Sequence, residues 1–327
     1  MATLTVFEAG YCTHTACVAL RGAGLRTCAF PARAWLIETA GRRWLWDTGY
    51  ASHFHDHTRS GLFAIYRKVT PVYFDTSESM AAQLAQQGLR PADLDGLIVS
   101  HFHGDHVAGL RDFPGVPVIC SGEGWMHLRA LRGVSALRRA FVPGLIPEDF
   151  ETRTRFVEQF EQVALPPELA PFTSAWAVPD SNGDVLLVPL PGHAAGHIGA
   201  FVRTHDGWVL LAADAAWSPL SYRELRGPSV LAYSIMEDRH AYFDTLRKLH
   251  ALDAGGHVRI LLTHEGTLLP RSTACCGRTG RHAGCSQPTV PRWRRTSNTR
   301  LRASRSVCSH AARTSASSHR SRCASGR

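Results

Sequence analysis

The sequence has no stretch approaching 18 consecutive apolar residues, and its first ten residues lack a basic segment followed by an apolar one. A chain without these features is predicted to carry neither a membrane span nor a secretion signal. The cysteines outside the C-terminal tail show no metal-type pairs with matching spacing and no secreted disulfide pattern. These four are Cys12, Cys17, Cys28 and Cys120. The absences together predict a cytoplasmic protein, because the cytosol keeps thiols reduced.

The C-terminal tail, residues 271–327, lacks lysine, aspartate and glutamate, but holds 13 arginines and five of the nine cysteines. It has only scattered large apolar residues, so it cannot build a core of its own. We therefore predict that this tail is disordered, or that it is the product of a shifted reading frame. A basic arm that binds nucleic acid is the functional alternative.

The excess of basic charge comes from this tail. Residues 1–270 hold 23 of the 36 basic residues and all 27 acidic ones, which gives this part a net charge of about −4. That charge does not predict nucleic acid as a partner, and we expect a small-molecule substrate instead. At 327 residues with 44% hydrophobic side chains, the chain is long enough for one large α/β domain, which we place at residues 1–270.

Four potential metal ligands lie within six residues: His101, His103, Asp105 and His106. They follow the short run 97–100, whose apolar and β-branched residues predict a buried strand that ends where the histidines begin. Imidazoles and carboxylates are ligands of zinc and neighbouring divalent metals. The turn at Gly104 separates the ligands into two pairs, which favours two metals over one. The alternative is a polar loop in which the histidines occur by chance.

Later in the chain, an apolar strand is again followed by histidine or aspartate. The predicted strands and the residues after them are 185–190 with His193, 208–212 with Asp214, and 258–262 with His264. Taken singly, each of these residues would more often be structural, but the recurrence makes all three candidate ligands. Predicted helices over 77–87, 122–131 and 237–250 alternate with the strands, as in an α/β layer.

Three further features stay open at this point. Asp47 closes an early strand and is either an outer partner of a ligand or an ordinary Asx turn. The cluster His53, His55 and His57 follows no strong apolar strand, which indicates a mobile loop over the substrate mouth or a solvated turn. Residues 132–171 are predicted to form an insertion that covers the site and selects the substrate.

The His-x-His-x-Asp-His motif, the later Gly-His, the Asp after a strand and the final His resemble the metallo-β-lactamase-fold hydrolases over residues 3–265. The resemblance implies an αββα sandwich with the metals at one edge of two packed sheets. It also implies two zinc ions, with iron or manganese as alternatives. One metal would be held by His101, His103 and His193, and the other by Asp105, His106 and His264, with Asp214 bridging.

Within that superfamily, the turn 47–49 and the run 191–193 look most like the acyl-homoserine lactonase branch, which implies quorum quenching. That branch usually places a tyrosine three residues after the bridging aspartate, where it polarises the substrate carbonyl. Here Trp217 stands in that place, and its N–H can donate a hydrogen bond but cannot transfer a proton.

The resulting prediction is a dinuclear zinc hydrolase that cleaves a small ester or lactone. A bridging hydroxide would attack the carbonyl, and Asp105 or a water would protonate the leaving oxygen. Two alternatives remain: a thioesterase of the glyoxalase II type and a non-catalytic, metal-stabilised binding protein.

Overall fold

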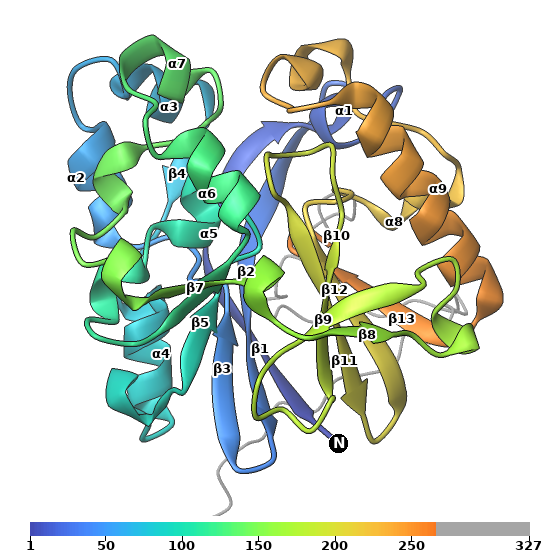
Figure 1. Ribbon diagram of the computed structural model, residues 1–327. Helices are drawn as coiled ribbons and strands as arrows, with labels where there is room; N and C mark the ends of the chain where they lie inside the picture. The colour runs from blue at the N-terminus through green and yellow to red at the C-terminus, as the bar shows by residue number, and fades with distance from the viewer. Residues whose placement is uncertain (266–327) are drawn as a thin grey trace, which may run out of the picture. The chain divides into compact units, whose positions relative to one another are not determined.

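Two β-sheets form the centre of residues 1–265, the part of the chain that the computed structural model describes (Figure 1). The first sheet has the order β4-β1-β2-β3-β5-β6-β7. Its strands are β1 (Thr3–Thr15), β2 (Thr27–Thr39), β3 (Arg42–Trp46), β4 (Val72–Tyr73), β5 (Gly96–Ile98), β6 (Val118–Cys120) and β7 (Thr154–Phe156). The second sheet has the order β13-β12-β11-β10-β9-β8. Its strands are β8 (Gln162–Ala164), β9 (Ser174–Ala177), β10 (Val185–Pro189), β11 (Ile198–Thr204), β12 (Gly207–Ala213) and β13 (Val258–Leu262).

Helices cover the outer faces of the two sheets (Figure 1). The α-helices are α1 (Ala16–Ala19), α2 (Ser52–Thr58), α3 (Ala64–Val69), α4 (Met80–Gln86), α5 (Gly104–Val107), α6 (Gly122–Leu128), α7 (Gly133–Leu137), α8 (Pro219–Arg223) and α9 (Arg239–Gly255). The 3-10 turns are η1 (Thr76–Glu78), η2 (Pro91–Asp93), η3 (Leu110–Asp112), η4 (Pro143–Leu145), η5 (Glu151–Arg153), η6 (Val157–Gln159), η7 (Pro167–Leu169) and η8 (Val230–Ser234). Figure 1 shows α2 to α7 beside the first sheet and α8 and α9 beside the second.

The side chains alternate between two hydrophobic cores, which is why the sheets are buried on both faces. On β2, Trp35 and Ile37 belong to the core between the sheets, whereas Leu36 belongs to the core beneath the helices. On β10, Leu187 faces the other sheet, and its neighbours Leu186 and Val188 belong to the outer core. A period of two places successive side chains on opposite faces. This arrangement confirms the predicted αββα sandwich.

Three parallel pairings place the ends of the site-bearing strands at common sheet edges. β3 pairs with β5 and β5 with β6 in the first sheet, and β12 pairs with β13 in the second. Parallel neighbours end at the same edge of a sheet, so residues that directly follow them are brought together. The ends of β12 and β13 thus carry Asp214 and His264 side by side, although 50 positions separate them in the chain.

A buried carboxylate ties the two sheets together away from that edge. Asp184, just before β10, accepts a hydrogen bond from Thr39 Oγ1 on β2 over 2.6 Å. It also pairs with the Arg203 guanidinium on β11 at 2.8 Å. Because Asp184 is almost fully buried, its charge depends on these partners.

Residues 132–171 contain α7, four of the 3-10 turns and the strands β7 and β8. These two strands are the last members of the first and the second sheet, respectively. In residues 1–265, no helix combines the length and apolar character that crossing a bilayer requires. The predictions for residues 271–327 lie outside the described part of the chain.

Candidate metal centre

The motif that follows β5 is shared between an extended segment and a short helix. His101 and His103 lie between β5 and α5, whereas Asp105 and His106 lie within α5. Gly104 begins that helix, and its role differs from the turn that the sequence suggested. A Cβ at Gly104 would lie 2.8 Å from the Phe54 ring of α2. Glycine is therefore needed here because a neighbouring helix packs closely, and not to reverse the chain.

His193 depends on a second close approach. It follows β10 in the run 191–193, where Gly192 has φ +119° and lies against the backbone at the start of α9. A Cβ at Gly192 would lie 2.1 Å from the amide nitrogen of Tyr242. The absence of a side chain lets this loop pack tightly against α9, which fixes where His193 is presented.

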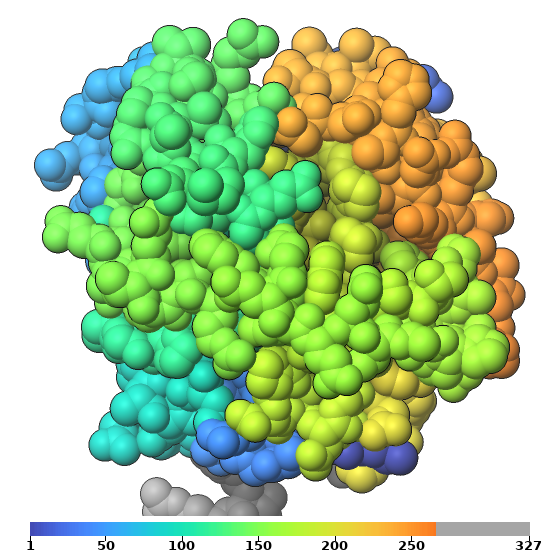
Figure 2. Space-filling view, in the orientation of Figure 1, coloured from blue at the N-terminus to red at the C-terminus, as the bar shows by residue number. Residues whose placement is uncertain are grey.

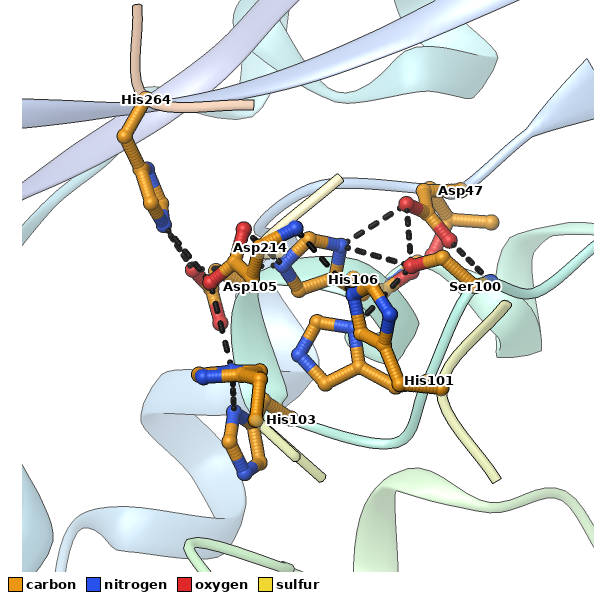
Figure 3. Close-up of polar contacts among 12 residues, drawn as sticks. Asp47, Ser100, His101, His103, Asp105, His106, Asp214 and His264 are labelled. Atoms are coloured by element: carbon orange, nitrogen blue, oxygen red, sulfur yellow. Dashed lines mark hydrogen bonds and ion pairs between the residues drawn. The ribbon is translucent and has the colours of Figure 1, made fainter. Parts of the chain in front are cut away.

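The structure brings together all seven predicted ligands, in two groups whose ligand atoms lie within 4.8 Å of one another. The first group is His101, His103 and His193, and the second is Asp105, His106, Asp214 and His264. Every member is buried. The division matches the one that the resemblance implied, with Asp214 between His106 and His264 (Figure 3).

Several ligand atoms of the described residues are buried without a hydrogen bond. Within residues 1–265, the Nε2 atoms of His101 and His106 and the Oδ1 atom of Asp214 are fully buried and lack a hydrogen bond of good geometry. The last two lie 3.4 Å from each other. Leaving a buried polar atom unpaired costs about 1–3 kcal/mol, so such atoms need an explanation. Imidazole nitrogens and a carboxylate oxygen that converge on one point fit a divalent metal of the zinc type.

Outer partners fix which nitrogen each histidine presents. A carboxylate can only accept, so His106 Nδ1–H donates to Asp47 Oδ2 over 2.8 Å (Figure 3). A backbone carbonyl oxygen can likewise only accept a hydrogen bond. The Nδ1–H of His264 therefore donates to the backbone oxygen of Pro31 over 2.8 Å. Both rings therefore turn Nε2 toward the centre.

Asp47 also organises Ser100, a residue that the sequence reasoning missed. Ser100 donates to the Asp47 carboxylate from its backbone N–H and from Oγ, each over 2.8 Å. The same Oγ lies 3.0 Å from His101 Nδ1 and can accept a hydrogen bond from the Nδ1–H of that ring. Asp47 is thus an outer partner of the ligands. Its backbone is in the left-handed region, with φ of 57°, a strained conformation that often occurs at functional sites.

The electrostatics separate the two groups of ligands. Burial lowers the pKa of the His103 imidazole to about 4 and the pKa values of His101 and His193 well below the usual range. These three rings are therefore neutral at physiological pH, which is the form that binds a metal. In the second group burial opposes charge on His106, but Asp105, Asp47 and Asp214 outweigh it and raise its pKa. The second group thus contains carboxylates whose negative charge can compensate the positive charge of a bound metal ion.

Trp217, which stands where related lactonases place a tyrosine that polarises the substrate carbonyl, directs its N–H at a ligand. The indole Nε1–H donates to Asp214 Oδ2 over 2.9 Å. The ring meets His193 edge to face, with centroids 5.5 Å apart, and Phe30 in the same manner at 6.3 Å. The structure therefore gives this N–H a protein acceptor, a role that the sequence did not indicate.

His197 is a second residue that the sequence reasoning missed. Its Nε2 accepts the backbone N–H of Asp214 over 3.2 Å, and its ring centroid lies 4.9 Å from that of His101. Burial lowers its pKa to about 3, so it is a neutral support for the ligand backbone. Its position four residues after His193 was the one available signal, and a histidine in such a run is more often structural.

The prediction that His53, His55 and His57 occupy a loop or solvated turn is wrong. They lie on α2, where Phe54 is fully buried against Tyr50 and Tyr66. His53 Nε2 lies 2.8 Å from Oδ1 of Asp112, just beyond the motif helix. This helix therefore braces the motif, and its histidines do not join the groups of ligands.

The sequence matches one family model and resembles several metal-dependent hydrolases. The model of the metallo-beta-lactamase superfamily matches residues 29–255. A probable metallo-hydrolase of Mycobacterium tuberculosis is 30% identical over 183 residues, which are 55% of each chain. The chain thus spans about half the length of this relative. The N-acyl homoserine lactonase AiiB of Agrobacterium fabrum is 23% identical, over 72% of this chain and 79% of its own.

Solved structures share the fold. An N-acyl homoserine lactone hydrolase, solved with its product N-hexanoyl-L-homoserine at the catalytic metal centre, superposes with a TM-score of 0.61. The match covers 80% of this chain and 92% of that chain, at 19% identity. The family model therefore confirms the superfamily that the motif resembled, and the solved structure shares its fold.

Proposed function

The chain belongs to the metallo-beta-lactamase superfamily, and on that premise we propose that it is a dinuclear zinc hydrolase that cleaves a small ester or lactone. One observation carries the proposal, namely the two adjacent groups of buried ligands with unpaired atoms directed between them. Seven ligands exceed the four that a single tetrahedral zinc accepts. Two bound metals supply Lewis acidity and an activated water, the chemistry by which such sites attack carbonyl compounds.

The protein's own contribution is to position and to protect the reacting groups. Asp105 Oδ2 lies 3.4 Å from His264 Nε2 and 3.7 Å from His106 Nε2. Its carboxylate is therefore at the centre of the second group, where it can hold a proton for a leaving oxygen. The burial of every ligand limits the contact of this carboxylate with bulk water.

Phe30 supplies an apolar wall beside the ligands. Its ring meets that of His264 at 5.6 Å between centroids and that of Trp217 at 6.3 Å. A wall of this kind favours a substrate with an apolar acyl group over a phosphate ester, whose charge would need basic partners. Lactones enter the proposal because lactonases are among the relatives and the superposable structures.

The test is a substrate panel of lactones, aryl esters and thioesters with the zinc-loaded protein. We expect turnover of at least one lactone or ester, which is lost in His193→Ala. The matched control is His205→Ala, an exposed histidine in the turn between β11 and β12, which keeps the parent rate. Turnover of thioesters alone would favour the glyoxalase II type, and zinc binding without any turnover would favour the non-catalytic binding protein.

A further inference from the structure

An ion pair joins two segments that reach the metal centre from opposite sides. The Arg139 guanidinium, two residues after α7, lies 2.7 Å from the Glu237 carboxylate, two residues before α9. The same guanidinium donates to the backbone oxygen of Met236 over 3.4 Å. Figure 2 shows the green residues around α6 and α7 and the orange residues before α9 facing one another across a hollow.

Each partner of this ion pair is also attached to a histidine of the first group. The backbone of Arg139 lies beside the His103 ring, where it acts to raise the pKa of that imidazole against the larger effect of burial. On the other side, the Glu237 N–H donates to the carbonyl oxygen of His193 over 3.2 Å, and the Asp238 N–H donates to that of Gly192 over 3.0 Å. The connection therefore runs from His103 through the ion pair to His193.

The two histidines that this connection links come from different sheets. His103 follows β5 of the first sheet, and His193 follows β10 of the second. Their facing nitrogens, His103 Nδ1 and His193 Nε2, lie 3.0 Å apart. Two nitrogens bound to one tetrahedral zinc at 2.0–2.1 Å stand roughly 3.3 Å apart, so the observed spacing is close to that of a ligand pair.

We propose that Arg139 and Glu237 are positioning residues, whose ion pair holds His103 and His193 at the spacing that the first metal requires. The inference rests on the proposed dinuclear centre and extends it to a pair of side chains that do not touch the metal. Holding the two ligands in place before binding reduces the ordering that the metal must bring about. Both side chains are about one-third exposed, so the interaction is partly screened by solvent and salt.

The side chains can be altered without removing the backbone contacts. Arg139→Met keeps the backbone that lies beside His103, and Glu237→Gln keeps the N–H that donates to the His193 carbonyl oxygen. Arg138→Met is the matched control, because Arg138 is exposed and has no ion pair within residues 1–265. His127 Nε2 lies 3.8 Å from the same Glu237 carboxylate, so every measurement is made at one fixed pH.

The experiment measures the affinity for the first zinc ion by competition with a chromophoric chelator, in low salt and in 1 M salt. Each single variant should bind that zinc about two- to fivefold more weakly than the parent in low salt. The double variant should be no weaker than the weaker single variant, because neutralising one partner already removes the interaction. In 1 M salt the difference should shrink. The unfolding temperature of the metal-free protein should match that of Arg138→Met.

Parent affinity in both single variants would overturn the proposal, as would losses that simply multiply in the double variant. A lower unfolding temperature with unchanged zinc affinity would show a structural ion pair only, and would also overturn it. If the parent and Arg138→Met bind no zinc, the proposed function fails and this inference fails with it. If they bind zinc and Arg139→Met binds it equally well, only the positioning role fails.

Discussion

The indole N–H of Trp217 donates to Oδ2 of Asp214 over 2.9 Å, within the cluster of buried ligands. The same oxygen lies 3.1 Å from His264 Nε2 and 3.5 Å from His193 Nε2. Trp217 thus holds the carboxylate that lies between the two groups of ligands. An outer partner of this kind acts on the metals through the ligand that it orients.

From this contact we predict that Trp217→Phe weakens zinc binding by about tenfold and lowers kcat on every substrate by a similar factor. The matched control is Trp125→Phe, whose indole N–H also donates to a carboxylate, that of Glu151, over 2.9 Å. That control should keep the zinc affinity of the parent. If zinc affinity is unchanged and kcat falls for lactones alone, the N–H acts on the substrate carbonyl, in the place of the tyrosine of the lactonase branch.

A second prediction concerns Asp47, which accepts the Nδ1–H of His106 over 2.8 Å. Asp47→Asn removes the charge that orients this ring, and should weaken zinc binding by about 10- to 100-fold. Asp112→Asn is the control, because Asp112 also lies 2.8 Å from a histidine nitrogen, that of His53, outside the ligand groups. Equal zinc affinities for the two variants in a competition titration would contradict the role assigned to Asp47.

These partners show where the sequence was informative and where it was not. The seven ligands were predictable because each follows an apolar strand and because imidazoles and carboxylates have few other uses there. Ser100 and His197 were missed because a serine or histidine beside a ligand is compatible with many structural roles. Their function depends on contacts such as the 3.2 Å bond from the Asp214 N–H to His197 Nε2, which joins positions 17 residues apart.

The elements of the fold likewise include some that the sequence predicted and some that it missed. The strand 258–262 was predicted with the bounds that the structure has, because a short apolar run before a histidine is unambiguous. The first strand was predicted over 4–7 but continues to Thr15, with a register shift between Glu8 and Tyr11. Tertiary pairing with β2 carries it past Gly10, where local preference favours a turn. Helix α2 was missed because its polar histidines give no helical period, and its packing rests on Phe54.

A third prediction concerns the contact between the sheets at Asp184. Burial opposes its charge, but the Met1 amino group, Thr39 and Arg203 outweigh burial and lower its pKa. Asp184→Asn should destabilise the fold by about 1–3 kcal/mol and lower the unfolding temperature by several degrees. Asp180→Asn, at an exposed aspartate 3.8 Å from Arg42, should leave that temperature unchanged. Thermal unfolding of the metal-free proteins compares them.

The depressed pKa of Asp184 also sets the direction of a pH effect. Its contribution to stability is fully present above the pKa of the unfolded chain and is lost as the pH falls through the folded pKa, below 3.8. The stability difference between the parent and Asp184→Asn should therefore narrow at acid pH. A difference that stays constant down to pH 2 would contradict the assignment.

A fourth prediction concerns residues 271–327, whose composition offers too little apolar surface to offset chain entropy. Truncation after Pro270 should leave zinc content, solubility and activity unchanged or improved. Size-exclusion chromatography and the substrate panel compare the two proteins. Loss of folding in the truncated protein would show that these residues are structural.

The most direct test of the central claim is the metal content of the purified protein after saturation with zinc and removal of the excess. Elemental analysis should find two zinc ions per chain, because His101, His103 and His193 form one buried group and Asp105, His106, Asp214 and His264 form the other. Asp47→Asn and Arg139→Met should reach the same content at higher zinc concentration. A content of no more than one zinc ion per saturated chain would contradict the dinuclear centre.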